Sequence, residues 1–582
     1  MTATATSSVA APEPLLPLPE ATVREALDEG VAEVRRRKDE WLEVGVRDRI
    51  ALLEEMINAF SAVGEAWAAA SCTGEGIPAD EPVGGEEWLV GPYLILRNLR
   101  LLRQTLTEIA ESGLPRIPGP IRTREDGQVT AQVFPASFYD RILYTGVTAE
   151  VWMEPGVTRK EMLEHLAEAY RHPAPEGKVA LVLGAGNVSS IGPTDALYKF
   201  FVENQVVIYK MHPLNAYLGS LIEQGFRPMV DRGFLRVVYG GAEVGAYLVD
   251  HPGIDEIHIT GSHHTVETIA FGSGEEGQRR KEERRPRLTK RITAELGNVS
   301  PLIVVPGPWT DGDIAYQAEN IASSLTNNAG FNCNATRVIV LHREWNQRRE
   351  LEAAVRKVLA ETPTRQAYYP GAEQRFDTFH EQHPEMETFG RKSGGHLPWA
   401  LIPDLDPQAE AEICFDTEAF CGVTGETALS ASSPAEFLDR AVDFANDTLW
   451  GTLNVTVIAH PASQRDPATR KAFDRAIANL RFGTVSINHW AGVNFGMMTT
   501  TWGAFPGHDL YDIQSGCGVV HNTLMFHKPQ KTVLKGPFRT SPKPPWFVSH
   551  GNVHNLAETL ADFETEPSVF KLPRLFWHAL RP

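Results

Sequence analysis

The sequence predicts an α/β protein with more than one domain, and three observations support this prediction. Its 582 residues exceed what a single hydrophobic core usually holds, so roughly two or three domains are expected. Hydrophobic residues make up 42% and charged residues 22% of the chain, as in ordinary globular proteins. From Lys178 onward, short apolar runs alternate with helical patterns, which is typical of parallel strands joined by helical crossovers.

The N-terminal part of the chain predicts a leader and then amphipathic helices. Residues 1–20 are rich in Thr, Ala, Ser and Pro, which predicts a flexible leader. No basic start precedes an apolar core, so these residues do not resemble a signal peptide. Residues 23–70 and 86–108 carry apolar side chains at helical spacing. These two stretches are therefore predicted to form surface helices.

A bridging segment is predicted next. Residues 112–135 are rich in Pro and Gly, which indicates turns and loops. Residues 136–154 then show the alternation of a strand. The apolar positions of this alternation are Tyr139, Ile142, Tyr144 and Val147.

The following stretch predicts a parallel sheet that binds a nucleotide. Four short apolar segments separated by helical patterns make up the expected Rossmann-type domain. They are residues 179–183, 206–209, 235–239 and 254–259. Glycines directly after the first segment let the backbone approach a ligand closely, although they do not complete the GxGxxG fingerprint.

Residues 292–341 place a carboxylate and a thiol at the two ends of one strand–helix unit. Glu295 precedes a strand-like apolar run at 301–305, and helical spacing at 313–324 lets the chain return toward its start. Cys333 follows in a polar, Asn-rich turn, 38 residues after Glu295. Core thiols favour apolar neighbours, so Cys333 is a candidate nucleophile that Glu295 can reach.

Two motifs in this stretch resemble the general-base and nucleophile motifs of the aldehyde dehydrogenase superfamily. They read Glu-Leu-Gly-Asn-x-Ser-Pro from Glu295 and Asn-Ala-Gly-Phe-Asn-Cys-Asn-Ala around Cys333. The resemblance implies that Cys333 attacks the carbonyl carbon of an aldehyde and that Glu295 later activates water. It also implies NAD or NADP as cofactor, and a homo-oligomer, either a dimer or a tetramer.

The resemblance extends to an oxyanion site and to the adenosine end of a cofactor site. Asn187 takes the place of the family's asparagine, whose amide hydrogen-bonds the developing oxyanion. An alternative is that Asn187 caps the helix that follows it. Lys210 ends a strand where the family holds the adenosine ribose or a 2′-phosphate.

Two further motifs resemble those that hold the rest of the cofactor. Thr260, Gly261 and Ser262 resemble the turn beside the cofactor pyrophosphate, where amides and a hydroxyl suit phosphate. Glu418 and Phe420 resemble the motif whose glutamate binds the nicotinamide ribose. All of these assignments rest on the family pattern.

The expected fold is that of the family: a Rossmann-type cofactor domain, an α/β catalytic domain and a small bridging or oligomerisation sheet. The tail is expected to dock on a surface, because it is rich in aromatic residues and proline, and to contribute to oligomerisation. The predicted boundaries are leader 1–20, cofactor domain 21–135 and 165–291, bridging segment 136–164, catalytic domain 292–518 and tail 519–582.

Composition restricts the partners and the compartment. The net charge of -19 repels polyanions, so nucleic acid is not expected as a partner. No apolar run approaches the roughly 18 residues that span a bilayer, so no membrane partner is expected. Five scattered cysteines favour a reducing compartment and form no CxxC pair of the kind that binds structural zinc. We therefore expect a cytoplasmic protein without a metal.

The predicted activity is NAD(P)-dependent oxidation of an aldehyde to an acid through a thiohemiacetal and a thioester on Cys333. One alternative is a CoA-acylating dehydrogenase or acyl-CoA reductase, which Glu295 disfavours because such an enzyme must avoid hydrolysis. Another is a catalytically silent relative, which retention of Cys333 and Glu295 does not support. A bulky or hydrophobic substrate is a further hypothesis, since four aromatic residues are candidates for an apolar tunnel: Phe331, Trp490, Phe495 and Trp502.

Overall fold

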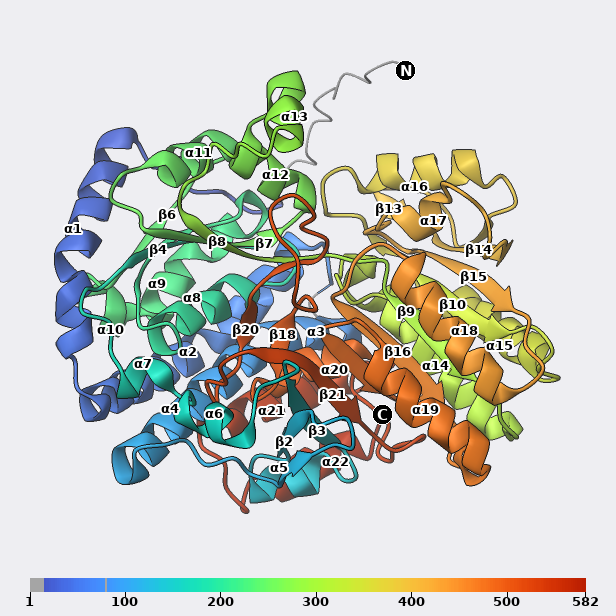
Figure 1. Ribbon diagram of the computed structural model, residues 1–582. Coiled ribbons are helices and arrows are strands. Elements are labelled where there is room, and N and C mark those ends of the chain that lie inside the picture. Colours follow the sequence, from blue (N-terminus) through green and yellow to red (C-terminus); the bar gives the residue numbers. More distant parts are fainter. Residues whose placement is uncertain (1–14, 79–80) are drawn as a thin grey trace.

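The computed structural model describes residues 15–78 and 81–582 (Figure 1). Most of the predicted leader lies outside the described residues. The architecture is α/β, with a six-stranded sheet toward the left of Figure 1 and an eleven-stranded sheet toward the right and bottom. Within the described part of the chain, no helix combines the length and the apolarity needed to cross a bilayer.

The six-stranded sheet confirms the predicted parallel sheet. All four predicted segments are strands, and every neighbouring pair is parallel except the pair of β19 with β8. β4, β5 and β7 are buried almost throughout, as expected for strands covered on both faces. In spatial order the strands are β19 (Gly516–Cys517), β8 (Arg291–Leu296), β7 (Glu256–Gly261), β4 (Val179–Leu183), β5 (Val206–Lys210) and β6 (Leu235–Val238).

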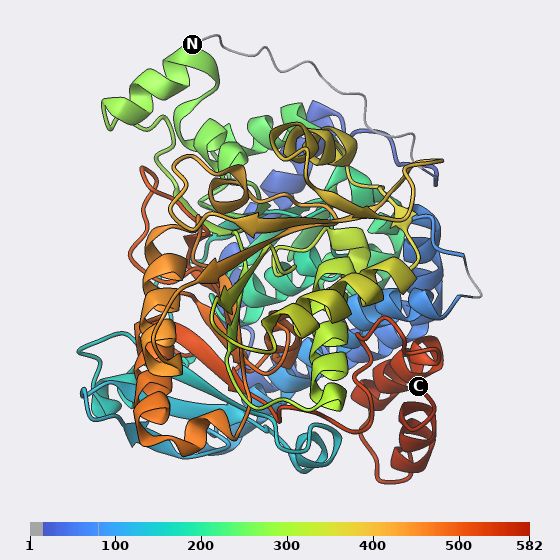
Figure 2. The ribbon, with the colours of Figure 1, turned by 90° about the vertical axis from the view of Figure 1, so that its right-hand side faces the viewer.

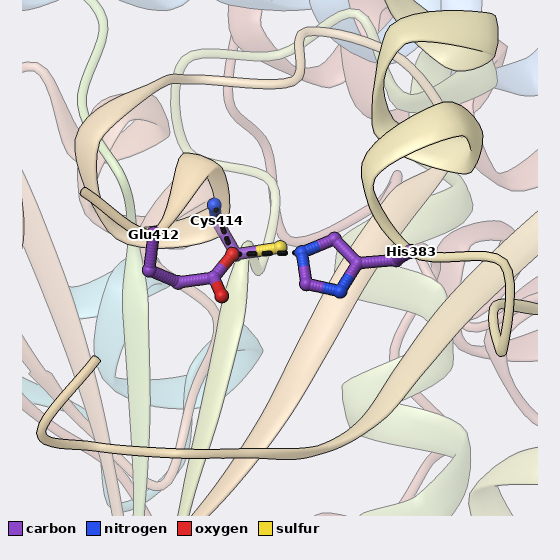
Figure 3. Close-up of side chains that lie close together, drawn as sticks. All are labelled: His383, Glu412 and Cys414. Carbon is purple, nitrogen blue, oxygen red and sulfur yellow. Dashed lines mark hydrogen bonds and ion pairs between the residues drawn. The ribbon is translucent and has the colours of Figure 1, made fainter. Parts of the chain in front are cut away.

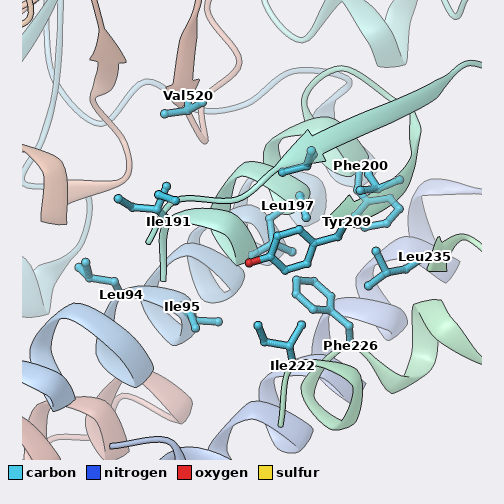
Figure 4. Close-up of a cluster of buried hydrophobic side chains, with 14 of the residues drawn as sticks. Leu94, Ile95, Ile191, Leu197, Phe200, Tyr209, Ile222, Phe226, Leu235 and Val520 are labelled. Carbon is cyan, nitrogen blue, oxygen red and sulfur yellow. The ribbon is translucent and has the colours of Figure 1, made fainter. Parts of the chain in front are cut away.

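Helices connect and cover this sheet. The crossovers include α8 (Ile191–Phe201), α9 (Gly219–Gly225), α11 (Ala242–Asp250) and α12 (His263–Phe271). A charged helix, α13 (Gly274–Glu282), projects at the top of Figure 1. Buried side chains of α8, β5 and α9 pack with Leu94 and Ile95, which belong to an earlier helix (Figure 4). This packing fixes the position of the loop between β4 and α8.

The N-terminal helices form where the periodicity predicts them, as α1 (Arg24–Glu43), α2 (Val46–Gly74), α3 (Gly85–Trp88) and α4 (Leu94–Ser112). The prediction that they are surface helices is wrong for α4, because every residue from 94 to 102 is buried. The reason is that a distant part of the chain covers this helix. A C-terminal helix, α21 (Val553–Thr565), packs against α2, α3 and α4, and Figure 2 shows the C-terminal helices beside the N-terminal ones.

The eleven-stranded sheet contains the predicted strands at 301–305 and 338–341. Its central seven strands run parallel, and helices α14 (Asp311–Thr326), α15 (Arg348–Glu361), α18 (Pro434–Asp447) and α19 (Pro467–Asn479) pack against it. In spatial order the strands are β1 (Ile121–Thr123), β2 (Val129–Phe134), β3 (Thr148–Met153), β21 (Pro529–Lys535), β17 (Thr484–Ile487), β16 (Asn454–Ala459), β9 (Pro301–Val305), β10 (Val338–His342), β15 (Val423–Leu429), β14 (Trp399–Leu405) and β12 (Glu387–Phe389).

The bridging strands differ from their predicted limits. They begin at Ile121 rather than at residue 136, because the Pro- and Gly-rich stretch includes the hairpin β1–β2. Residues 138–143 form helix α5 (Phe138–Leu143) instead of a strand, since Ser137 and Asp140 make a reciprocal capping box. β21, from the predicted tail, pairs with β3 on one side and β17 on the other, so the bridging strands and the catalytic strands form one sheet.

Candidate functional site

Two cavities meet at Cys333. The first has a volume of about 510 Å³ and a mostly apolar wall, and the second has a volume of about 920 Å³. Cys333 and Asn187 line both cavities. A molecule in either cavity can therefore reach the thiol.

The loop that carries Cys333 has an unusual backbone. After α14, Asn328 and Ala329 adopt left-handed conformations with φ of 52° each, and Gly330 follows with φ of 81°. Such conformations are costly for residues other than glycine and persist only when their surroundings hold them. At Gly330 a side chain is excluded, because a Cβ there would lie 2.7 Å from the carbonyl carbon of Cys421.

Side chains from distant elements hold this loop in place. Arg337 is buried and donates hydrogen bonds to the carbonyl oxygens of Gly330, at 2.7 Å, and Asn332, at 3.3 Å. Glu86 of α3 accepts from the backbone N–H of Asn328 at 3.0 Å and also pairs with Arg365. We assigned no role to Arg337 or Glu86 from the sequence. Arg337 lies in the motif around Cys333, but no local pattern shows what either side chain contacts.

Cys333 and Glu295 are brought together as the strand–helix unit predicts. The Cys333 thiol donates to Glu295 Oε1 at 3.6 Å, and the indole N–H of Trp502 donates to the same oxygen at 2.8 Å. Trp502 lies on β18 (Thr501–Gly503), and neither Trp502 nor Phe331 lines either cavity, so their predicted places in an apolar tunnel are wrong. Trp502 instead orients the carboxyl group toward the sulfur.

The environment of this pair favours the neutral forms. Glu295 is 2% exposed, and burial raises the pKa of its carboxyl group to about 8, although the bond from Trp502 acts in the opposite direction. Burial raises the pKa of the Cys333 thiol well above its usual value, and the nearby Glu295 raises it further. The thiol consequently needs a nearby group to take its proton when it reacts, and Glu295 is in contact with it.

Asn187 lies in the loop between β4 and α8, against the loop of Cys333. Its side-chain amide donates to the carbonyl oxygen of Phe331 at 2.9 Å. An asparagine amide has two N–H groups, so a second donor remains for a ligand in the cavities. The alternative of a helix cap is wrong, because α8 begins after Ser190.

The six residues assigned to the cofactor all line the second cavity, and four of them stand at strand ends. Lys210 ends β5, and Thr260 and Gly261 end β7. Ser262 follows and caps α12 by accepting a hydrogen bond from the backbone N–H of Thr265. Ligands of parallel sheets bind beyond the carboxyl ends of the strands, where these side chains lie. The complete set is Lys210, Thr260, Gly261, Ser262, Glu418 and Phe420.

The surroundings of Glu418 suit a nucleotide sugar in this cavity. Its Oε1 is buried and has no hydrogen-bond partner among the described residues, and burial raises the pKa of the carboxyl group to about 7. Gly297 makes room for it, since a Cβ at Gly297 would lie 1.9 Å from Glu418 Oε2. An unsatisfied buried acceptor is costly, and a ribose hydroxyl is a donor that would satisfy it. The residues present therefore fit the ribose of NAD(P).

His383, Glu412 and Cys414 form a second polar cluster (Figure 3). His383 stands between two carboxylates, with Glu412 Oε1 2.8 Å from Nε2 and Glu385 Oε1 2.9 Å from Nδ1. The ligand atoms of His383, Glu412 and Cys414 lie within 4.8 Å of one another. The backbone N–H of Cys414 already donates to Glu412 Oε1. These bonds join the end of α16 (Ala372–Gln382) to α17 (Ile413–Asp416), and we interpret the cluster as structural support for the segment that follows.

Comparison with known proteins supports one family. Residues 158–380 match the sequence model of the Aldehyde dehydrogenase family. The chain is 27% identical over 303 residues to 1-pyrroline-5-carboxylate dehydrogenase 2 of Bacillus subtilis (strain 168), covering 49% of this chain and 53% of that protein. It is 31% identical over 188 residues to human retinal dehydrogenase 2, covering 31% of this chain and 30% of that protein. The chain thus spans about half the length of the first relative and less of the second.

Solved structures show the same fold. The NADP complex of NADP-dependent glyceraldehyde-3-phosphate dehydrogenase from Bacillus halodurans C-125 superposes with a TM-score of 0.59 and 17% identity, covering 88% of this chain and 92% of that one. A mutant of aldehyde dehydrogenase C from Pseudomonas syringae, solved with NAD+ and octanal, superposes with a TM-score of 0.60 and 16% identity, covering 90% of each chain. At these identities the likeness concerns the fold.

Proposed function

The chain belongs to the aldehyde dehydrogenase superfamily, and from this premise we propose that it oxidises an aldehyde to a carboxylic acid with NAD or NADP. The observation that carries the proposal is the contact of the Cys333 thiol with Glu295 at the junction of two cavities. One cavity would admit the aldehyde and the other the cofactor.

The first step is addition of the thiol to the aldehyde. The sulfur of Cys333 bonds to the carbonyl carbon while the thiol proton passes to the ionised form of Glu295. The carbonyl oxygen becomes an oxyanion, and we assign its stabilisation to the Asn187 amide and the backbone N–H of Cys333. The product of this step is a thiohemiacetal on Cys333.

The second cavity would hold the cofactor through residues already in place. Lys210 would bind the adenosine ribose or a 2′-phosphate, and the turn at 260–262 the pyrophosphate. Glu418 would accept hydrogen bonds from the nicotinamide ribose, beside Phe420. NAD(P) supplies the acceptor for the hydride that leaves the substrate carbon as the thioester forms.

The last step is hydrolysis of the thioester. Glu295, after releasing the first proton, takes a proton from a water molecule as that water attacks the thioester carbon. The carbon–sulfur bond breaks, the carboxylic acid leaves, and the sulfur of Cys333 takes the proton that Glu295 received from water. Because Glu295 contacts the sulfur, a water held by its carboxylate would lie next to the thioester.

The proposal is tested by following NAD(P)H absorbance with a panel of aldehydes, with and without CoA. We expect turnover without CoA, loss of turnover in Cys333→Ala, and accumulation of a thioester in Glu295→Gln. Cys517→Ala is the matched control, since Cys517 is also partly exposed but lines neither cavity. Turnover only with CoA would instead indicate a CoA-acylating enzyme, and absence of both turnover and cofactor binding would indicate a silent relative.

We also propose a homo-oligomer, a dimer or tetramer, in the cytoplasm. The oligomer is supported by exposed apolar side chains, among them Phe138 and Phe570, and the compartment by five free cysteines. Light scattering measures the first, and microscopy of the tagged protein in its own cell measures the second. A monomer at working concentration would contradict the oligomer.

A further inference from the structure

The tail of the chain forms one wall of the first cavity. Beyond β21 the chain crosses the cavity and then folds into α21 and α22 (Leu572–Ala579). Its apolar contributions to the wall include Pro545, Trp546, Leu556, Leu560, Leu575 and Phe576. The remaining wall includes the helical region around Leu89 and Leu94, residues between 142 and 147, and α20 (Ala491–Met497), and Cys333 also lines the cavity.

We propose that the tail is a fixed cap over the aldehyde site, and that it selects aldehydes with an extended, uncharged apolar group. This proposal rests on the proposed function, because it names the substrate class of that same site. The apolar chain of the substrate would lie along the cavity while its carbonyl carbon reaches Cys333. A cavity of about 510 Å³ lies within the range of small-molecule sites.

Buried charges lock the cap onto the body of the protein. Glu564 of α21 accepts from Arg97 Nη1 at 2.8 Å and from Arg100 Nε at 2.5 Å, and both arginines belong to α4. The side chains of Arg97 and Glu564 are 1% and 3% exposed, so water does not screen this pair. Arg97 also contacts Asp140 at 3.1 Å, which anchors it from a third segment. The cap is therefore a built part of the site.

The charges around the cavity argue against an anionic aldehyde. Three charged side chains reach the wall, namely Glu86, Arg539 and Lys543. Each is already paired with an opposite charge. Glu86 pairs with Arg365, Arg539 with Asp313, and Lys543 with Glu319. A carboxylate or phosphate on the substrate would have to compete with these pairs, and burying it unpaired is costly.

The first test compares acetaldehyde, octanal and succinic semialdehyde with the full-length protein. We expect kcat/KM for octanal to exceed that for each of the other two by at least about tenfold, since apolar contacts of a chain add up in such a pocket. Leu560→Trp should reduce kcat/KM for octanal by about tenfold or more and leave acetaldehyde within about twofold. Equal losses for both aldehydes, or no preference for octanal in the unaltered protein, would overturn the proposal.

A second variant keeps the proposal testable if Leu560→Trp does not fold. Phe576→Ala enlarges the wall, and Trp577→Ala is its matched control, because Trp577 is the next residue on α22, is 55% exposed and does not line the cavity. We expect Phe576→Ala to shift the preference toward aldehydes longer than octanal, and Trp577→Ala to leave it unchanged. The same shift in both variants would contradict a role for the wall.

A measurement without turnover separates this proposal from the proposed function. Iodoacetamide labels Cys333, and octanol in the cavity should slow the labelling more than ethanol does at the same concentration. Leu560→Trp should abolish the difference. Protection by octanol in a protein that oxidises no aldehyde would support the apolar tunnel and reject the oxidation. Absence of protection in a protein that oxidises acetaldehyde would reject the tunnel and keep the oxidation.

Discussion

At the scale of single residues, the contact of Glu295 with Trp502 determines when the glutamate can act as a base. Burial raises the pKa of Glu295 to about 8, and the indole bond lowers it. The carboxyl group is protonated below that pH and ionised above it. Only the ionised form takes a proton from water, so thioester hydrolysis should become faster as pH rises through about 8.

Quenched single-turnover measurements of thioester decay between pH 6 and 10, roughly two units either side of that pKa, test this prediction. In Trp502→Phe the midpoint should move to higher pH, because the bond that stabilises the charged form is lost. In Glu295→Gln the residual decay should show no inflection at that midpoint. A midpoint that stays in place in Glu295→Gln would assign the titration to another group.

The sequence predicted that Cys333 and Glu295 would meet, but not the residues that orient them. Cys333 and Glu295 are recognisable because a polar turn, a short strand and a helix between them are local features. Trp502 lies 207 positions from Glu295, and no local pattern shows that its N–H meets a carboxylate rather than an apolar cavity. Gly297 is similar, since its lack of a side chain is explained only by the approach of Glu418.

At the scale of elements, α4 and α21 show that local sequence patterns predict a helix but not which other helix covers it. Amphipathic spacing predicted the helices of the N-terminal region, and the four predicted strands of the cofactor sheet lie within about two residues of those observed. Spacing did not show that α4 is covered by α21, which is more than 400 positions later. Short elements are also set by their caps, as the capping box before α5 shows. The alternating apolar pattern of residues 138–143 predicted a strand, but the two hydrogen bonds of the capping box between Ser137 and Asp140 favour a helix.

The pairing of α21 with α4 gives a stability prediction. Glu564→Gln leaves the buried Arg100 without a charged partner and leaves Arg97 with Asp140 alone, and breaking a buried pair costs about 3–5 kcal/mol. Glu558→Gln is the matched control on the same helix, because its pair with Arg574 is exposed and spans 3.8 Å. Loss of an exposed pair costs at most about 1 kcal/mol.

Thermal unfolding of both variants measures the difference. The Tm of Glu564→Gln should fall clearly below that of the unaltered protein, while that of Glu558→Gln should stay close to it. Octanal oxidation should weaken with Glu564→Gln, since the cap depends on this network. Equal Tm values for the two variants would show that α21 is not held by its buried charges.

At the scale of the whole molecule, α5 and the tail form one edge of the protein that carries exposed apolar side chains. Tyr139 of α5 packs on Phe563 of α21, with ring centroids 5.2 Å apart, so α5 and the tail lie together. Exposed apolar side chains occur on both, including Phe138 at 63% and Phe570 at 90% exposure. Exposed apolar surface of this kind marks contacts between proteins.

We expect a second copy of the chain to cover this edge. Light scattering during size-exclusion chromatography should give a mass of two or four chains for the unaltered protein. The double variant Phe138→Asp, Phe570→Asp should have a mass closer to one chain, because a desolvated contact does not tolerate a charge. Val23→Asp is the matched control, since Val23 is also 63% exposed but precedes α1. An oligomer that persists in the double variant would place the interface elsewhere, and a monomeric unaltered protein would leave these side chains exposed in solution.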